Sequence, residues 1–213
     1  MELTQVTEDE QITNFVLNTN KVVFGNRRLV RTKILQILTA HFVSNTPIEL
    51  LINHIFNRYF IVDEEYNDSD NNNIKLSANE VIVDEEKLAD INYDSLISWK
   101  PNDQEFAMTI IHSTIKNYDL FVEYIKKTSD NWAFDRIAIL DRVIMMIAMS
   151  EFLCAPDVPI KVTINEALEL AKTFSTPKST MYVNGMLEKI KDILEAKKLI
   201  YKSERGLQSG KYS

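Results

Sequence analysis

The spacing of apolar residues most constrains what this chain can fold into, because apolar side chains recur every three or four positions over most of it. Over 102–198 this period is broken only by short polar runs, and over 26–44 it forms one stripe of Val30, Ile34, Ile37, Leu38 and Phe42. Such a period is typical of helices that bury one face. Only four Gly and five Pro occur in 213 residues, which disfavours many tight hairpins. The sequence predicts an all-α fold, a compact bundle of about seven helices.

Polar breaks in this period predict where the helices begin and end. A first helix over 26–44 should be capped by Asn26 and stopped by 45–47, and a second should follow over 47–61. Further helices are expected over 102–116, 118–127, 134–153, 164–174 and 179–198. The helix over 134–153 should be central, because apolar residues nearly encircle it.

Three polar positions are candidate helix caps. Asn102 with Glu105, and Thr163 with Glu166, have the spacing of a capping box, in which side chains satisfy backbone N–H groups of the first turn. Ser179 is placed to cap the last helix. These residues predict that each helix begins directly after its cap.

The remaining segments complete the predicted domain organisation. Residues 1–25 form an N-terminal extension, interpreted as a flexible arm or a short extra helix. An N-terminal helical subdomain spans 26–116 and contains an acidic insertion at 62–94, whose low hydrophobicity predicts a mobile loop. A C-terminal helical subdomain follows over 117–200, and 201–213 form a basic tail.

The net charge of −7 at first argues against a nucleic-acid partner, but the acidic groups are unevenly distributed. Residues 62–94 contain eleven Asp/Glu and two Lys, so this insertion carries −9 and the rest of the chain carries +2. A polyanion responds to charges within about 10 Å at physiological salt, so the local patch matters more than the total. Composition therefore leaves nucleic-acid binding open.

Other features disfavour several classes of protein. Cys154 is the only cysteine, so no internal disulfide can form, which favours a reducing, cytoplasmic setting. No apolar run reaches the roughly 18 residues of a membrane span, and the N-terminus lacks a signal-peptide pattern. His41, His54 and His112 fall on three predicted helices without metal-ligand spacing, and no phosphate loop or nucleophile motif occurs. We therefore expect no enzyme activity, no metal, no cofactor and no membrane partner.

Two sequence runs in the second half carry a family resemblance. Residues 157–172 read D-V-P-I-K-V-T-I-N-E-A-L-E-L-A-K, and 182–187 follow with Y-V-N-G-M-L. These runs, with upstream matches at Trp132, Arg136, Ala138, Ala148 and Glu151, resemble the NusB antitermination family. The segment 175–179 is similar to the version found in the Bacteroidetes lineage. The resemblance covers about 26–61 and 102–195.

The resemblance implies both a fold and a function. It implies two helical subdomains packed together, and an RNA-binding transcription factor of the cytoplasm. Members of the family bind the single-stranded boxA element of ribosomal RNA leader transcripts together with ribosomal protein NusE. They then help RNA polymerase, in an antitermination complex, to pass terminators. A homodimer stays open, since the sequence does not give the oligomeric state.

The arginine-rich start of the first predicted helix is the first candidate RNA-binding site. It carries Arg27, Arg28, Arg31 and Lys33, and no acidic residue occurs over 21–48. Arg27 and Arg31 are one turn apart, and a helix N-terminus adds partial positive charge for phosphate oxygens. Arginine also suits stacking and bidentate contacts with single-stranded bases. The alternative is a solvated helix start with ordinary basic side chains.

The junction before the last helix is the second candidate site. Lys178 offers a charge, Ser179 a hydrogen-bond donor, and Tyr182 an aromatic face for a base. The alternatives are that Ser179 is only a cap and Tyr182 only core. Gly185 is expected to let two helices approach closely.

Asp141 interrupts the apolar central helix and is the candidate contact for a basic partner such as NusE. That role requires the side chain to be exposed. A local ion pair with Arg136 or Arg142 is the alternative.

Two further functional hypotheses stay open. The chain could be a non-catalytic helical scaffold that binds a protein and no RNA, with 62–94 as its binding surface. NusB-like domains also occur fused to rRNA cytosine methyltransferases, but no cofactor-binding α/β domain could follow Leu194 in the residues present, which disfavours that class.

Overall fold

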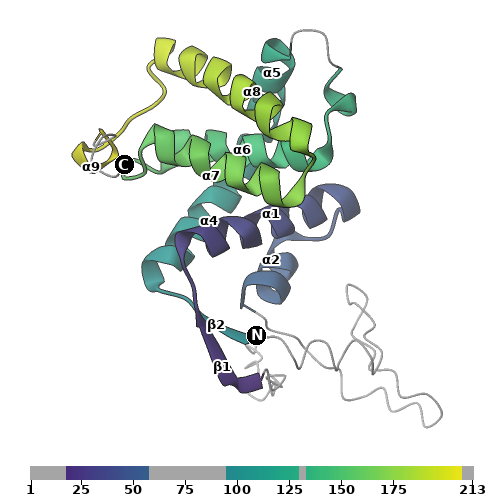
Figure 1. Cartoon of the computed structure of the whole chain (residues 1–213), viewed down its shortest axis with the longest axis vertical. Helices are drawn as coiled ribbons and strands as arrows, with labels where there is room; N and C mark the ends of the chain where they lie inside the picture. The colour runs from purple at the N-terminus through teal and green to yellow at the C-terminus, as the bar shows by residue number, and fades with distance from the viewer. Residues whose placement is uncertain (1–17, 58–94, 130–132, 208–213) are drawn as a thin grey trace, which may run out of the picture. The chain divides into compact units, whose positions relative to one another are not determined.

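The computed structural model describes residues 18–57, 95–129 and 133–207 (Figure 1). By their contacts, the described residues divide into two units. The first unit draws on Met1–Phe24 and Thr46–Ser98, and the second on Gly25–Asn45 and Trp99–Ser213. The acidic insertion at 62–94, residues 1–17 and the end of the basic tail lie outside the described residues. The predicted subdomain boundaries at 116 and 200 stay predictions.

The second unit is built around helix α6 (Ile139–Cys154). Helices α1 (Arg27–Ser44), α4 (Pro101–Lys116), α5 (Tyr118–Thr128), α7 (Ile160–Phe174) and α8 (Pro177–Ala196) all contact it. Figure 1 shows α6 among these helices. All residues from Val143 to Phe152 are buried. Full burial of one large aliphatic side chain contributes about 1.5–3 kcal/mol, so α6 holds the unit together. The predicted central position is confirmed.

Helix α1 begins and ends as its sequence predicts. The side chain of Asn26 accepts a hydrogen bond from the Leu29 backbone N–H, and Asn45 adopts the left-handed conformation (φ 55°) that ends the helix. The predicted apolar stripe faces the core, with Val30, Ile34, Ile37 and Leu38 fully buried. Local side-chain chemistry and hydrophobic spacing agree here, which is why the prediction is confirmed.

The other three predicted caps are wrong. Helix α4 begins at Pro101 after Lys100, α7 begins at Ile160 after Pro159, and α8 begins at Pro177 after Thr176. None of these N-termini has a side-chain cap. Proline fixes φ near −65° at or before the first turn and has no N–H to satisfy, so it starts helices without a capping side chain.

The helix predicted over 134–153 is divided in two. A 3₁₀ turn, η2 (Phe134–Arg136), precedes α6, and Ile137 and Ala138 between them are extended. Gly185 is also not where two helices meet, because an added Cβ would have no neighbour within 4 Å. That expectation is wrong.

The first unit contains two short strands and one irregular helical stretch among its described residues. Strand β1 (Asn18–Phe24) pairs in parallel with β2 (Ser95–Ser98), with Val22 opposite Leu96 and Phe24 opposite Ser98. The second predicted helix appears as α2 (Ile48–Leu51) followed by the π-helical η1 (Ile52–Asn57). The strand at 18–24 corrects the interpretation of that segment as an arm or extra helix.

Gly25 lies where the chain enters the second unit. It is buried, and a Cβ at this position would collide with the ring of Trp99. Only glycine permits this close approach. The contact fixes the residue directly before the cap of α1. No helix in the described part of the chain is long and apolar enough to cross a membrane.

Candidate nucleic-acid interface

Arg31 of α1 and Glu151 of α6 form a buried ion pair. Their side chains are 4% and 1% exposed. Arg31 Nε and Nη2 donate to the two carboxylate oxygens over 2.6 and 2.8 Å, and Thr163 Oγ1 donates to the same carboxylate over 3.1 Å. Burial alone would lower the pKa of Arg31, but the hydrogen bond and charge of Glu151 outweigh it and raise that pKa. Arg31 is therefore held as a cation, and its two bonds with Glu151 fix its side chain.

This arrangement changes the role predicted for Arg31. Its third nitrogen, Nη1, donates to the backbone oxygen of Arg27 over 3.4 Å and lies 3.8 Å from Glu166. All three guanidinium nitrogens thus have partners inside the protein. We correct Arg31 from a direct RNA contact to a buried residue that fixes the start of α1 on α6.

Arg27 lies at the edge of this cluster with its side chain 42% exposed. Its Nε is 3.0 Å from Asp103 of α4, and its guanidinium lies 4.2 Å above the centre of the Phe106 ring. Burial lowers the pKa of Arg27, opposed by the Asp103 charge and reinforced by the charges of Arg31 and Arg205. Arg27 is therefore oriented by an acid and a ring while part of it still faces solvent.

Arg28 and Lys33 differ from Arg27 in their surroundings. The Arg28 side chain is 61% exposed and binds Glu166 of α7 through Nε and Nη2 at 3.2 and 2.8 Å. This hydrogen bond and the Glu166 charge raise the pKa of Arg28. Lys33 is half-buried farther along α1. The cations of the first predicted site thus point in different directions.

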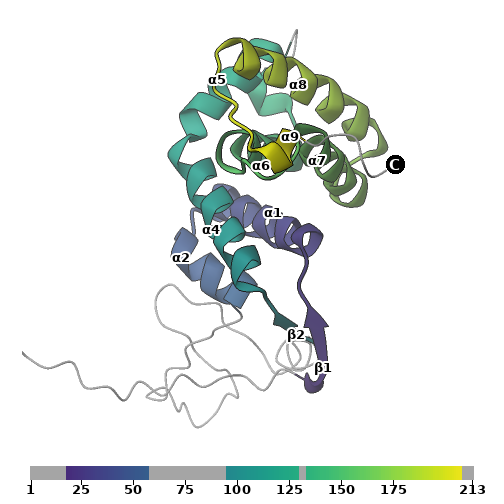
Figure 2. The ribbon, with the colours of Figure 1, turned by 90° about the vertical axis from the view of Figure 1, so that its left-hand side faces the viewer.

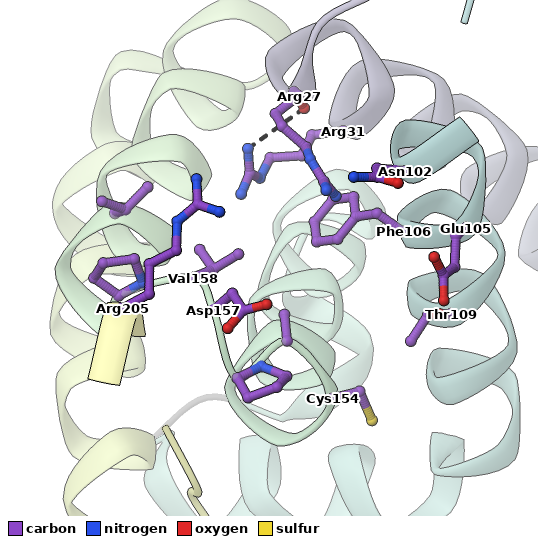
Figure 3. A pocket seen from close by; sticks show the side chains of 14 residues that line it. Arg27, Arg31, Asn102, Glu105, Phe106, Thr109, Cys154, Asp157, Val158 and Arg205 are labelled. Carbon is purple, nitrogen blue, oxygen red and sulfur yellow. Dashed lines mark hydrogen bonds between the residues drawn. The ribbon is translucent and has the colours of Figure 1, made fainter. Parts of the chain in front are cut away.

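An open pocket of about 640 Å³ lies beside Arg27 (Figure 3). Helix α1 contributes Arg27 and Arg31, and α4 contributes Asn102, Glu105 and Phe106. The loop after α6 contributes Asp157, and the short helix α9 (Glu204–Leu207) contributes Arg205. Three guanidinium groups therefore meet two carboxylates, an amide and an aromatic ring around one hollow. The Arg31 guanidinium is already paired and Phe106 is buried, so Arg27 and Arg205 are the lining groups that could hold a phosphate.

The second predicted site is mainly a hydrogen-bonded turn. Ser179 is buried, and its hydroxyl bonds with those of Ser175 and Thr176 at 2.9 and 2.8 Å. Ser175 donates to Asp141 over 2.6 Å. Lys178 in the first turn of α8 is exposed. Lys178 is thus open to a ligand, whereas Ser179 supports the turn.

Asp141 does not meet the condition for its predicted role. The residue is 5% exposed, and the hydrogen bond from Ser175 holds its carboxylate. Among the described residues, no ion pair joins it to Arg136 or Arg142 either. We correct the expectation of an exposed acid: Asp141 supports the turn before α8, and we leave it out of the partner surface.

Tyr182 is half-buried on α8. Its hydroxyl is buried without a hydrogen-bond partner. Burial and the charge of Asp141 raise the pKa of this hydroxyl, so Tyr182 is neutral at physiological pH. Its hydroxyl is turned inward, so a base could reach only what remains exposed of the ring.

Metal binding has no support in the described residues. Within 18–57, 95–129 and 133–207, no group of three or more His, Cys, Asp or Glu side chains could hold a metal ion. Cys154 lies 3.1 Å from the Ser113 hydroxyl and is half-buried.

Comparison with known proteins gives the family. A model of the NusB family matches residues 71–192, more than half of the chain. The chain belongs to the NusB family. The predicted family resemblance is confirmed.

Relatives of the NusB family include two curated transcription antitermination proteins named NusB. One, from Chloroherpeton thalassium, is 40% identical over 126 residues, which cover 59% of this chain and 55% of that protein. Another, from Natranaerobius thermophilus, is 38% identical over 116 residues, covering 54% of this chain and 84% of that protein. This chain thus spans about half the length of the first relative.

A solved NusB structure has the same fold. The structure of T. maritima NusB aligns with a TM-score of 0.50 and 24% identity, covering 80% of this chain and 93% of that one. The predicted all-α fold class is confirmed. The NusB family model leaves out 1–70, so it does not include α1 or its arginines.

Several residues of the pocket were missed from the sequence. Phe106, Asp103 and Arg205 were not singled out as candidate functional residues, and Glu151 was only a motif position. Arg31 carried a signal that could have been used: with Ile34 and Leu38 it falls on the buried stripe at positions i, i+3 and i+7. Nothing in the local sequence around Arg205 indicates that it reaches α1.

Proposed function

We propose that this chain is a non-catalytic, cytoplasmic transcription antitermination factor that binds boxA-type single-stranded RNA of rRNA leader transcripts. Its partners would be ribosomal protein NusE and the RNA polymerase antitermination complex. One observation carries the RNA-binding part: the partly exposed Arg27 borders an open pocket that also contains Phe106 and Asn102. Membership of the NusB family supports the transcriptional role.

The proposed contacts follow from the exposure of each cation. Arg27 would bind a phosphate or stack on a base, since Asp103 and the Phe106 ring hold its guanidinium in place while 42% of the side chain stays exposed. Arg28 and Lys178 would add phosphate contacts from exposed positions. Lys33 and Tyr182 are half-buried and would contribute less to RNA binding. Arg31 and Ser179 would not contact the RNA. Arg31 would hold the start of α1 on α6, and Ser179 would hold the turn before α8.

The direct test reverses charge at Arg27 and Arg28 together. Arg27→Glu with Arg28→Glu should weaken binding of a short, fluorescein-labelled boxA RNA by roughly 100-fold, measured by anisotropy over a salt series. The slope of log affinity against log salt should fall by about 0.7 for each lost phosphate contact. Arg31 is left unchanged, because a glutamate there would face Glu151 in the core.

A matched control has the same change in charge elsewhere. Lys116→Glu with Lys127→Glu alters two exposed cations that do not line the pocket, and it should leave affinity within about threefold. If both double variants lose the same RNA affinity, the loss follows from the change in net charge alone, which would contradict the assigned site.

NusE binding is tested separately. Pull-down of NusE should succeed without RNA and should increase the affinity for boxA RNA. The protein-scaffold alternative predicts no RNA binding with or without NusE, so the same titration separates the two functions.

A further inference from the structure

The segment after α8 returns to the end of α6 and is held there by its own side chains. Lys202 Nζ donates to the backbone oxygens of Glu151 and Ala155 over 3.1 and 2.8 Å. These oxygens lie at the C-terminal end of α6 and at its cap residue, where the partial negative charge of the helix favours a cation. Figure 2 shows α9 lying in front of α6 and α7.

Ser203 and Gly206 complete this attachment. Ser203 N–H donates to Pro156 O over 3.1 Å, and its hydroxyl donates to the Asp157 carboxylate over 2.6 Å. Gly206 is buried, and a Cβ there would collide with Pro156 O and approach Lys202 Cβ to 3.2 Å. Helix α9 therefore lies directly against Pro156, in the loop after α6 whose residues 155–159 line the pocket.

This position makes Arg205 part of the lining of the pocket, across from the α4 residues Asn102 and Glu105 (Figure 3). In Figure 3 the Arg205 guanidinium extends toward the end of the pocket that holds Arg27 and Arg31. Arg205 and Arg27 are close enough for the positive charge of Arg205 to help lower the pKa of Arg27. Two cations from distant parts of the sequence thus share one hollow.

Arg205 differs from the α1 arginines in its pairing. Arg27, Arg28 and Arg31 each have a carboxylate partner in the described residues, namely Asp103, Glu166 and Glu151. No described carboxylate forms an ion pair with Arg205, and the nearby Asp157 accepts a hydrogen bond from Ser203. An anion entering the pocket would therefore meet Arg205 without displacing an existing ion pair.

We propose that Arg205 is an RNA-binding residue, which binds a phosphodiester of the same single strand that contacts Arg27. The inference rests on the proposed function and adds a residue beyond the part of the chain that the family model matches, 71–192. The occupant is an anion, because the positively charged Arg27 and Arg205 both line the hollow. The carboxylates of Glu105 and Asp157 restrict where a phosphate can sit, which favours the arginine end of the pocket.

The test compares Arg205→Ala, Arg205→Lys and the control Lys127→Ala with the unmodified chain. Each is titrated with the labelled boxA RNA at several salt concentrations, and each is checked by urea unfolding. Arg205→Ala should weaken binding by about 3- to 10-fold and lower the salt slope by about 0.7. Arg205→Lys should keep the slope because it keeps the charge. Lys127→Ala should change neither quantity.

A second variant moves Arg205 without removing it. Gly206→Val should push α9 away from Pro156 and give an RNA defect like that of Arg205→Ala, although the guanidinium is still present.

The possible outcomes separate the two proposals. Unchanged affinity and slope in Arg205→Ala, together with the expected loss in the Arg27/Arg28 double variant, would overturn the role of Arg205 alone. A loss of affinity with an unchanged slope would also overturn it, because the effect would then be transmitted through the fold. If the unmodified chain binds no RNA, both proposals fall.

Discussion

Helix α6 buries one carboxylate near each end, and the two are stabilised in different ways. Asp141 lies in the first turn and accepts a hydrogen bond from Ser175, without an ion pair among the described residues. Glu151 lies in the last turn and is bound by both Arg31 and Thr163. The N-terminus of a helix carries partial positive charge and the C-terminus partial negative charge.

The helix dipole explains the difference. It stabilises the Asp141 carboxylate, so the hydroxyl of Ser175 suffices there. It opposes the Glu151 carboxylate, which is instead paired with the full positive charge of Arg31. Lys202 donates to carbonyls at the same C-terminal end. Cations gather at one end of α6 for a structural reason, and the candidate RNA pocket is formed beside them.

The largest effect is expected at the Glu151 end. Glu151→Ala would leave Arg31 buried without its partner, and should lower the free energy of unfolding by about 3–5 kcal/mol, measured by urea denaturation. Combining Arg31→Met with Glu151→Leu removes both charges and should restore most of that loss. A single variant as stable as the unmodified chain would contradict the assigned pair.

A smaller effect is expected at the Asp141 end. Asp141→Asn keeps the shape but removes the charge, so the interaction with the helix dipole and the strong hydrogen bond from Ser175 are both weakened. The free energy of unfolding should fall by roughly 1–2 kcal/mol. A loss equal to that of Glu151→Ala would show that the dipole does not distinguish the two ends.

Removing one hydroxyl at each end sharpens the comparison. Ser175→Ala takes away the hydrogen bond that Asp141 receives, whereas Thr163→Val leaves Glu151 with both bonds from Arg31. The first should lower the free energy of unfolding by about 1 kcal/mol and the second by about 0.5 kcal/mol. The reverse order in chemical denaturation would contradict this account.

The smallest effect is expected for Tyr182→Phe, which removes a buried hydroxyl without a partner. Stability at neutral pH should change by less than about 0.5 kcal/mol. Because the pKa of Tyr182 is raised in the folded chain, the tyrosine favours folding below its ordinary pKa of about 10 and loses this contribution as pH rises through the folded value. The stability of the phenylalanine variant relative to the unmodified chain should therefore increase at alkaline pH.

The sequence predicts what depends on local spacing. The buried stripe of α1, the break at Asn117 and the central α6 follow from the period of apolar residues. The caps at Asn102 and Thr163 were mispredicted because prolines start those helices, and because Thr163 bonds with Glu151, twelve residues away along the chain.

The candidate site depends on contacts between residues far apart in the sequence, which the local spacing of residues does not predict. Arg31 and Glu151 are 120 residues apart, so their pairing follows only from how α1 packs on α6. Arg205 reaches the pocket because Lys202 and Ser203 bind the end of α6. The strand at 18–24 was missed because its partner, 95–98, lies far along the chain.

The order in which the chain visits its two units limits how the molecule can be divided. It passes from the first unit at Phe24 to the second, returns at Thr46, and leaves again after Ser98. Each unit consists of two separate segments, so no single truncation point separates one unit from the other. Truncations made to map RNA or NusE binding would therefore remove part of both units. During synthesis on the ribosome, α1 cannot pack on α6 until α6 has been made. The ion pairs of Arg31 with Glu151 and of Arg28 with Glu166 therefore form only after most of the chain has been synthesised.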